Sequence, residues 1–145
     1  MSKPKLSSFL KPTVDTPFHI DFDWWKEHDR SWRVHLRSCL CDEHQDMYAD
    51  LSGDELVDWI DPETAEVQRV DGLQHTLISH CAKQEQFITE QTTLTEALFR
   101  TFLANGNQPL SPDQLAENLN RAPNKILQTI SGTRVYKGIR PVPLK

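Results

Sequence analysis

Four side chains that can bind a metal ion occur in two short segments of the chain. Cys41 and His44 form a Cys-x₂-His pair, and His80 and Cys81 are direct neighbours in a later segment. Zinc in structural sites takes four thiolate or imidazole ligands at tetrahedral angles, usually as two local pairs that the fold brings together. The sequence therefore predicts one structural zinc ion, with four ligands: Cys41, His44, His80 and Cys81.

The same residues also have an ordinary interpretation. Small buried thiols and surface histidines are common without a metal, and no second Cys-x₂-Cys pair strengthens the zinc signal. Cys39 is left out of the predicted ligands because it continues the apolar pattern set by Trp32 and Leu36. Three cysteines, an odd number, argue against a disulfide framework, so we expect a cytoplasmic location.

No signature of catalysis accompanies the metal-binding residues. The glycines are scattered rather than gathered in a phosphate-binding loop, and the sequence has no Gly-x-Ser-x-Gly motif. We therefore expect a non-enzymatic protein without a small-molecule substrate. No apolar run reaches the roughly 18–20 residues that a membrane span needs, so we expect no membrane partner either.

Charge is distributed unevenly along the 145 residues, which carry a net charge of −5. Residues 106–145 have six basic and two acidic side chains, a net charge of +4. Residues 1–105 have ten basic and nineteen acidic side chains, a net charge of −9. Such segregation favours an anionic partner for the C-terminal part, although a well-solvated acidic surface is the more common meaning of an acidic segment.

The N-terminal part is predicted to be helical and rich in tryptophan. Residues 1–17 have little periodicity and are interpreted as a flexible tail. A helix then begins at Asp21 or Asp23 and continues to about Leu40, because Trp24 or Trp25, Trp32 and other apolar residues recur every three or four positions. Large aromatic side chains at helical spacing are more often core than a platform for stacking nucleic-acid bases.

Two extended segments follow the tryptophan-rich region. Residues 57–60 and 66–70 contain β-branched and aromatic side chains, and Pro62 lies at the second position of a turn between them. This pattern predicts a β-hairpin. Asp71 then begins another helix, and residues 18–90 together are predicted to form one acidic helical unit.

The last fifty residues carry clear signals for helix ends. Thr93 with Glu96 and Ser111 with Gln114 have the spacing of capping boxes, in which each side chain bonds to the other residue's backbone amide. Pro123 restarts a helix after a tight turn that begins at Asn120. Residues 133–136 and 139–142 are then predicted to pair as a second hairpin.

This order of elements over residues 92–142 resembles the winged helix-turn-helix family. The predicted fold is therefore α+β and mainly helical, with a tryptophan-rich helical N-terminal unit and its hairpin packed on a C-terminal winged helix over residues 91–145. The resemblance implies that the helix after the turn lies in the major groove of duplex DNA and that the hairpin touches the backbone.

The resemblance also implies roles for the exposed polar residues. Base edges would be contacted by Asn124, Lys125, Gln128 and Thr129. Phosphates would be contacted by Arg121, Arg134, Lys137 and Arg140. This hypothesis describes a transcription-related regulatory protein that binds DNA.

A protein–protein adaptor is the alternative. In that hypothesis the winged module and the acidic hairpin, with Asp58, Asp61 and Glu63, bind protein partners, and duplex DNA is not bound.

Overall fold

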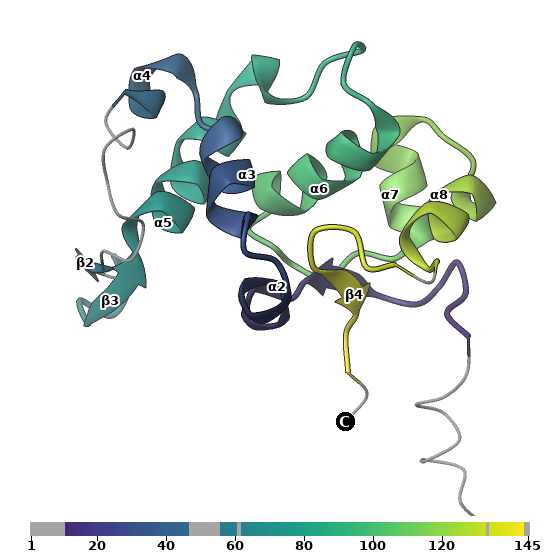
Figure 1. Ribbon diagram of the computed structural model, residues 1–145, viewed down its shortest axis with the longest axis horizontal. Coiled ribbons are helices and arrows are strands. Elements are labelled where there is room, and N and C mark those ends of the chain that lie inside the picture. The colour runs from purple at the N-terminus through teal and green to yellow at the C-terminus, as the bar shows by residue number, and fades with distance from the viewer. Residues whose placement is uncertain (1–10, 47–55, 61, 133, 144–145) are drawn as a thin grey trace, which may run out of the picture. The chain divides into compact units, whose positions relative to one another are not determined.

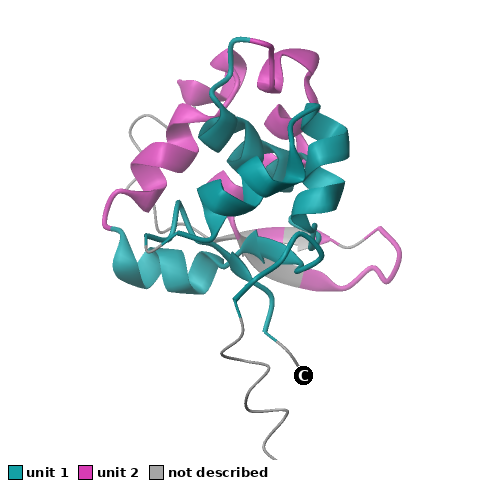
Figure 2. Cartoon of the chain, turned by 90° about the vertical axis from the view of Figure 1, so that its right-hand side faces the viewer, with its two compact units in different colours: residues 1–29, 91–145 teal, residues 30–90 magenta. Residues whose placement is uncertain are grey.

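The chain forms two compact units, residues 1–29 with 91–145 and residues 30–90 (Figure 2). The computed structural model describes residues 11–46, 56–60, 62–132 and 134–143. The fold is α+β and mainly helical, which confirms the predicted fold class. The unit boundaries differ from the predicted segments, because residues 18–29 belong with the C-terminal residues rather than with residues 30–90.

Helix α6 (Leu94–Ala104), labelled in Figure 1, has more buried side chains than α2, α7 or α8, the other described helices of the first unit. It begins where the Thr93 hydroxyl accepts a hydrogen bond from the amide of Glu96, which is one half of the predicted capping box. The Glu96 carboxylate also accepts hydrogen bonds from Arg100 and Tyr136. The buried side chains of α6 are those of Ala97, Leu98, Phe99, Thr101, Phe102 and Leu103.

A small antiparallel sheet joins the two ends of this unit. Strand β1 (Phe18–Ile20) pairs with strand β4 (Ile139–Pro141), and Ile20 lies opposite Ile139. On its other edge β1 exchanges two backbone hydrogen bonds with Leu110, at 2.9 and 3.0 Å. The Asn107 side chain both donates to and accepts from the backbone of Ile20, at 2.8 Å each. Strand β1 is therefore hydrogen-bonded on both edges.

This pairing corrects the prediction of a second hairpin. The predicted first strand began at residue 133, which lies outside the described residues, and residues 134–138 contain no strand. The tight turn is present, because the amide of Ile139 donates to Tyr136 and both Lys137 and Gly138 have positive φ. The partner of β4 is nevertheless the distant strand β1, whose Phe-His-Ile composition suits a strand.

The predicted tail is also corrected in its second half. Residues 1–10 lie outside the described residues. Residues 11–17 are bonded within the first unit: the carbonyl of Val14 accepts from Asp113, and that of Pro17 accepts from Val142.

The predicted helix from Asp21 to Leu40 is two helices. Helix α2 (Phe22–His28) begins at Asp21, whose carboxylate accepts from the amide of Trp24. It ends at Asp29, which has extended backbone angles and accepts a hydrogen bond from the Trp25 indole. Helix α3 (Trp32–Ser38) starts anew in the second unit. The prediction was wrong because Asp and Ser around the break favour helix caps over helix interiors.

The α2 helix anchors the core of the first unit through Trp25. This side chain is 1% exposed, and its ring packs edge-on against Phe99 with centroids 5.4 Å apart. The prediction that tryptophan is core holds for Trp25. Trp24 is half-buried, stacked on His28 at 4.1 Å and covered by the Arg140 guanidinium. Side chains of the same unit therefore already cover the Trp24 ring, which argues against its use as a platform for stacking nucleic-acid bases.

Two short helices complete the first unit. Helix α7 (Pro112–Leu119) begins with a full capping box between Ser111 and Gln114, as predicted. It ends at Asn120 in the left-handed conformation, and helix α8 (Pro123–Ile130) follows after a three-residue turn. Ile126 and Ile130 of α8 are buried, so its polar residues face outwards.

The second unit combines helices with a separate two-stranded sheet. Strands β2 (Leu56–Ile60) and β3 (Val67–Asp71) pair antiparallel, which confirms the predicted hairpin. Helix α5 (Gly72–Ser79) follows directly, and Asp71 caps it by accepting from the amide of Gln74. The Asp71 carboxylate also forms an ion pair with Arg33 of α3. This pair fixes the start of α5 relative to α3.

Three short segments complete the second unit: helix α4 (Asp42–Gln45) and the 3₁₀ turns η1 (Cys81–Lys83) and η2 (Glu85–Phe87). The core of the unit consists of Leu36, Cys39, Leu40, Leu73, Leu77, Cys81, Ala82 and Phe87. None of the helices in the described part of the chain has the length and apolar character that a membrane crossing needs.

Candidate functional site

The first arm of the candidate site is the single turn α4. Cys41 is its N-terminal cap, and the amides of His44 and Gln45 both donate to the Cys41 carbonyl at 3.0 Å. Residues three apart on a helical turn lie on the same side. The turn therefore places the side chains of Cys41 and His44 together, with His44 Nδ1 3.2 Å from Cys41 Sγ.

The second arm is the end of α5. The α-helix stops at Ser79, and His80 has backbone angles that belong to neither helix type (φ −125°, ψ −63°). The chain then continues as η1, which begins at Cys81. This change of helix type lets two adjacent residues face one site, although neighbours on a regular α-helix point about 100° apart.

The two arms meet at their sulfur atoms. Cys81 Sγ lies 3.3 Å from Cys41 Sγ and 3.8 Å from His44 Nδ1. Tetrahedral zinc with bonds of about 2.3 Å to sulfur and about 2.0–2.1 Å to nitrogen requires ligand atoms about 3.3–3.8 Å apart. The three edges of the triangle formed by Cys41, His44 and Cys81 fall at or within about 0.5 Å of these lengths, so their donor atoms match one face of a zinc tetrahedron.

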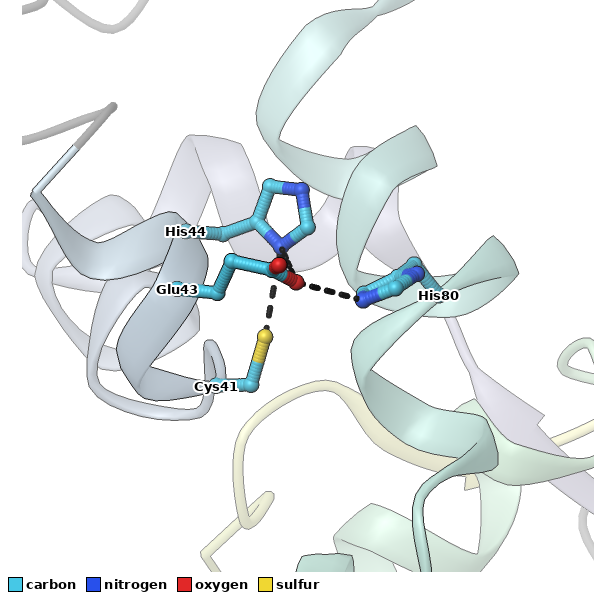
Figure 3. Close-up of side chains that lie close together, drawn as sticks. All are labelled: Cys41, Glu43, His44 and His80. Carbon is cyan, nitrogen blue, oxygen red and sulfur yellow. Dashed lines mark hydrogen bonds and ion pairs between the residues drawn. The ribbon is translucent and has the colours of Figure 1, made fainter.

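Two further donors, Glu43 and His80, lie beside Cys41 and His44 (Figure 3). His80 Nε2 is 3.2 Å from a carboxylate oxygen of Glu43, and that oxygen is 3.9 Å from His44 Nδ1. The donor atoms of Cys41, Glu43, His44 and His80 all lie within 4.8 Å of one another, so these residues could hold a metal ion. Glu43 is 72% and His80 47% exposed, which places them at the outer side of the site.

Burial controls the protonation of the inner thiol. It raises the pKa of Cys81 from an ordinary value near 9 to about 11, and the neighbouring Cys41 thiol adds to the rise through its side-chain hydrogen bond. Without a cation, Cys81 is therefore a neutral thiol at physiological pH. A bound divalent cation reverses this balance, because it stabilises the thiolate directly.

Three of the four predicted metal ligands, Cys41, His44 and His80, belong to the group of mutually close donors, and Cys81 lies against Cys41 and His44. The fourth member of the group, Glu43, was not among the predicted ligands. The residue stands between Cys41 and His44, so it was in the correct segment. It was overlooked because the surrounding sequence is rich in acidic residues, and a carboxylate carries little information there.

The predicted DNA-contacting residues lie on a different part of the chain, around α7 and α8. Arg121, Asn124, Lys125, Gln128 and Arg134 are exposed. Thr129 is half-buried, and its hydroxyl donates to the carbonyl of Lys125. These placements leave most of the outer face of α8 available to a partner.

Two of the predicted cations have contacts within the first unit. Lys137 Nζ lies 5.8 Å from the centre of the Tyr136 ring. Arg140 forms an ion pair with Asp21 at 3.1 Å and lies over the Trp24 ring. Arg140 therefore has a structural role that the sequence analysis did not anticipate, since its partner Asp21 is at the other end of the chain.

Comparison of the chain with protein-family models, with curated proteins and with solved structures found no match.

Proposed function

We propose that residues 30–90 form a zinc-binding module in which Cys41, His44, His80 and Cys81 hold one structural Zn²⁺. The observation that carries this proposal is the convergence of donor atoms from two distant segments, with Cys41 and Cys81 separated by 40 positions. Cys41, His44 and Cys81 meet at separations of 3.2, 3.3 and 3.8 Å, within about 0.5 Å of those that tetrahedral zinc requires.

The donor types support zinc over other metals. Two thiolates and two imidazoles are a common structural zinc set, whereas Ca²⁺ and Mg²⁺ take oxygen ligands. His80 and Glu43 lie close to Cys41 and His44 and are the two candidates for the fourth position, and imidazole gives the complete Cys₂His₂ set. We therefore assign His80 to the fourth position and leave Glu43 outside the ligand set.

A structural role follows from the ligand count. Four protein ligands leave no open coordination position for a substrate, unlike catalytic zinc sites. The ion would instead link α4 to the end of α5. A unit of about 60 residues buries only a limited core, so a structural metal adds substantially to its stability.

Metal analysis tests this proposal. The full chain, purified without added metal, should contain about one equivalent of zinc, and a chelator should lower its melting temperature because metal binding contributes to folding. Less than about 0.2 equivalents, with melting unchanged by chelator, would contradict the proposal. Replacement of zinc by Co²⁺ should give the intense absorption of a tetrahedral thiolate complex, which checks the geometry without any substitution.

Matched variants test the ligand assignment. His80→Gln should weaken zinc binding about 10-fold or more, while Glu43→Gln should retain the stoichiometry. Cys39→Ser is the control for thiol substitution, because Cys39 is buried at the end of α3 and is not part of the donor group around Cys41. If Glu43→Gln loses zinc and His80→Gln retains it, the assignment is wrong although the site stands.

A second function is supported by the first unit: we propose that it binds duplex DNA through α7 and α8. The supporting observation is a pair of helices joined by a three-residue turn, with the polar side of the second helix exposed and its apolar side buried. In this proposal Asn124, Lys125 and Gln128 face base edges in the major groove. Arg121, Arg134 and Lys137 contact phosphates, and the role is regulatory.

Fluorescence anisotropy with a random-sequence duplex at about 50 mM salt tests DNA binding, because phosphate contacts are strongest at low salt. Binding should weaken steeply with added salt. Replacement of Lys125, Arg134 and Lys137 by alanine should abolish it. A matched triple variant, in which equal charge is removed elsewhere, should bind as the wild type does: Lys11→Ala, Arg30→Ala and Lys83→Ala.

Failure to bind at low salt would contradict the DNA proposal and favour the adaptor. The described part of the hairpin offers a surface for it, since Ile60 and Val67 are opposite one another and 63% and 62% exposed. Asp58 and Glu63 nearby are exposed, and Asp61 lies outside the described residues. Neutralising Asp58 and Glu63 should then abolish a salt-sensitive pull-down of a basic protein partner.

A further inference from the structure

The two thiols of the proposed zinc site are placed to react with each other. Their sulfur atoms are 3.3 Å apart. A disulfide bond is about 2.05 Å long, so the sulfurs need to approach by only about 1.3 Å to become bonded. The pair is also asymmetric, because Cys81 is 1% exposed while Cys41 is half-buried.

We propose that the site is a redox-responsive zinc centre, in which a peroxide joins Cys41 and Cys81 as a disulfide and thereby releases the metal. This inference rests on the proposed zinc binding. Hydrogen peroxide is the two-electron oxidant of the reaction. A disulfide sulfur is a far weaker ligand than a thiolate, since the thiolate is the metal-binding form of cysteine. The oxidised site would lose both thiolates and keep His44 and His80 with the Glu43 carboxylate beside them, so its affinity for zinc should fall and a chelator should remove the ion.

The reaction proceeds in two steps. The Cys41 thiolate attacks one oxygen of hydrogen peroxide, the O–O bond breaks, and the departing hydroxide takes a proton to become water. Cys41 is left as a sulfenic acid. The Cys81 thiolate then attacks the Cys41 sulfur, forming the S–S bond and expelling hydroxide, which takes a second proton. Two thiolates lose two electrons in all, the peroxide gains two, and Zn²⁺ leaves without a change of oxidation state.

The burial of each sulfur sets this order. Susceptibility to peroxide follows exposure and thiolate character, so Cys41 is the sulfur that peroxide reaches. Cys81 is protected by the core and resolves the sulfenic acid before further oxidation. A dithiol reductant should reverse the change by thiol–disulfide exchange and restore zinc binding.

The zinc-loaded full chain is treated with hydrogen peroxide, and two products are measured. A chromogenic chelator reports released zinc, and mass spectrometry of proteolytic fragments locates the disulfide. We expect one zinc ion released for each Cys41–Cys81 bridge formed, and recovery of binding after reduction and zinc addition. Cys39→Ser should release zinc and form the Cys41–Cys81 bridge as the wild type does, because this cysteine takes no part in the reaction.

The outcomes distinguish the two proposals. A protein that binds no zinc before oxidation contradicts both. A protein that binds zinc but keeps it while the two thiols survive peroxide contradicts the redox inference alone. So does zinc release with Cys41 carried to the sulfinic or sulfonic acid and no bridge, since the resolving role of Cys81 would then be wrong.

Discussion

The close approach of Gly138 to Trp25 makes a quantitative prediction for the first unit. Gly138 has φ +80°, and a Cβ atom there would lie 2.9 Å from Trp25 Cβ and 3.2 Å from the Asp21 carbonyl oxygen. The left-handed conformation costs a non-glycine residue about 1–2 kcal/mol. Crowding against a packed core adds about 1–3 kcal/mol. Lower entropy of the unfolded chain offsets about 0.4–1 kcal/mol. Gly138→Ala should therefore lower the free energy of unfolding by about 1–4.5 kcal/mol.

Gly106 provides the matched control. It has φ +72°, and a Cβ atom there would meet nothing within 4 Å. Gly106→Ala should therefore carry only the backbone cost, and lower the free energy of unfolding by about 1 kcal/mol or less. The difference between the two variants isolates the contact with Trp25.

Urea denaturation followed by near-ultraviolet circular dichroism measures both variants. The urea concentration at the midpoint of unfolding should fall further for Gly138→Ala than for Gly106→Ala. The slope of the unfolding free energy against urea concentration should stay unchanged, which indicates a change of stability rather than of the surface exposed on unfolding. Equal losses for the two alanine variants would refute the proposed packing of the turn on Trp25. In that case the argument that β4 and α2 share one core would also fail.

Three further predictions concern single contacts. Ser111→Ala should cost about 1 kcal/mol of unfolding free energy through loss of the capping box. Ser131→Ala, at the exposed C-terminal cap of α8, removes one hydrogen bond to the Leu127 carbonyl and should cost less than about 0.5 kcal/mol; urea denaturation compares the two variants. Asn107→Ala should cost about 2 kcal/mol by leaving two backbone groups of Ile20 unpaired, and hydrogen exchange at that amide should accelerate. In metal-free protein the free energy of unfolding should fall as pH rises from 9 to 11, because the raised pKa of Cys81 keeps a proton on the folded chain that the unfolded chain has lost. Urea denaturation across this pH range checks the last prediction, and Cys81→Ala should remove the fall.

Local signals in the sequence predicted the elements that depend on neighbouring residues. The capping box at Ser111 and the β2–β3 hairpin require only residues a few positions apart, and both are present in the structure. The proximity of Cys41 and Cys81 was also predictable, because their side-chain types alone single out two local pairs that the fold needs only to bring together.

Long-range pairing was not predictable from such signals. The sequence analysis gave β4 a partner from the adjacent residues, whereas its partner is β1 near the other end of the chain. The break at Asp29 was missed for a similar reason: the apolar spacing continues from Trp25 to Trp32, although the two side chains belong to different units. Periodicity shows which residues are buried but not in which core they are buried.

The pairing of β1 with β4 has a consequence for how the protein is made. Asp21 and its ion-pair partner Arg140 are 119 positions apart, so the ribosome adds Arg140 long after Asp21. At about 5–20 residues per second, the interval between the two is about 6–24 s. Residues 30–90 are synthesised completely within this interval and are free to fold, while strand β1 remains without its partner until residues 139–141 have been added.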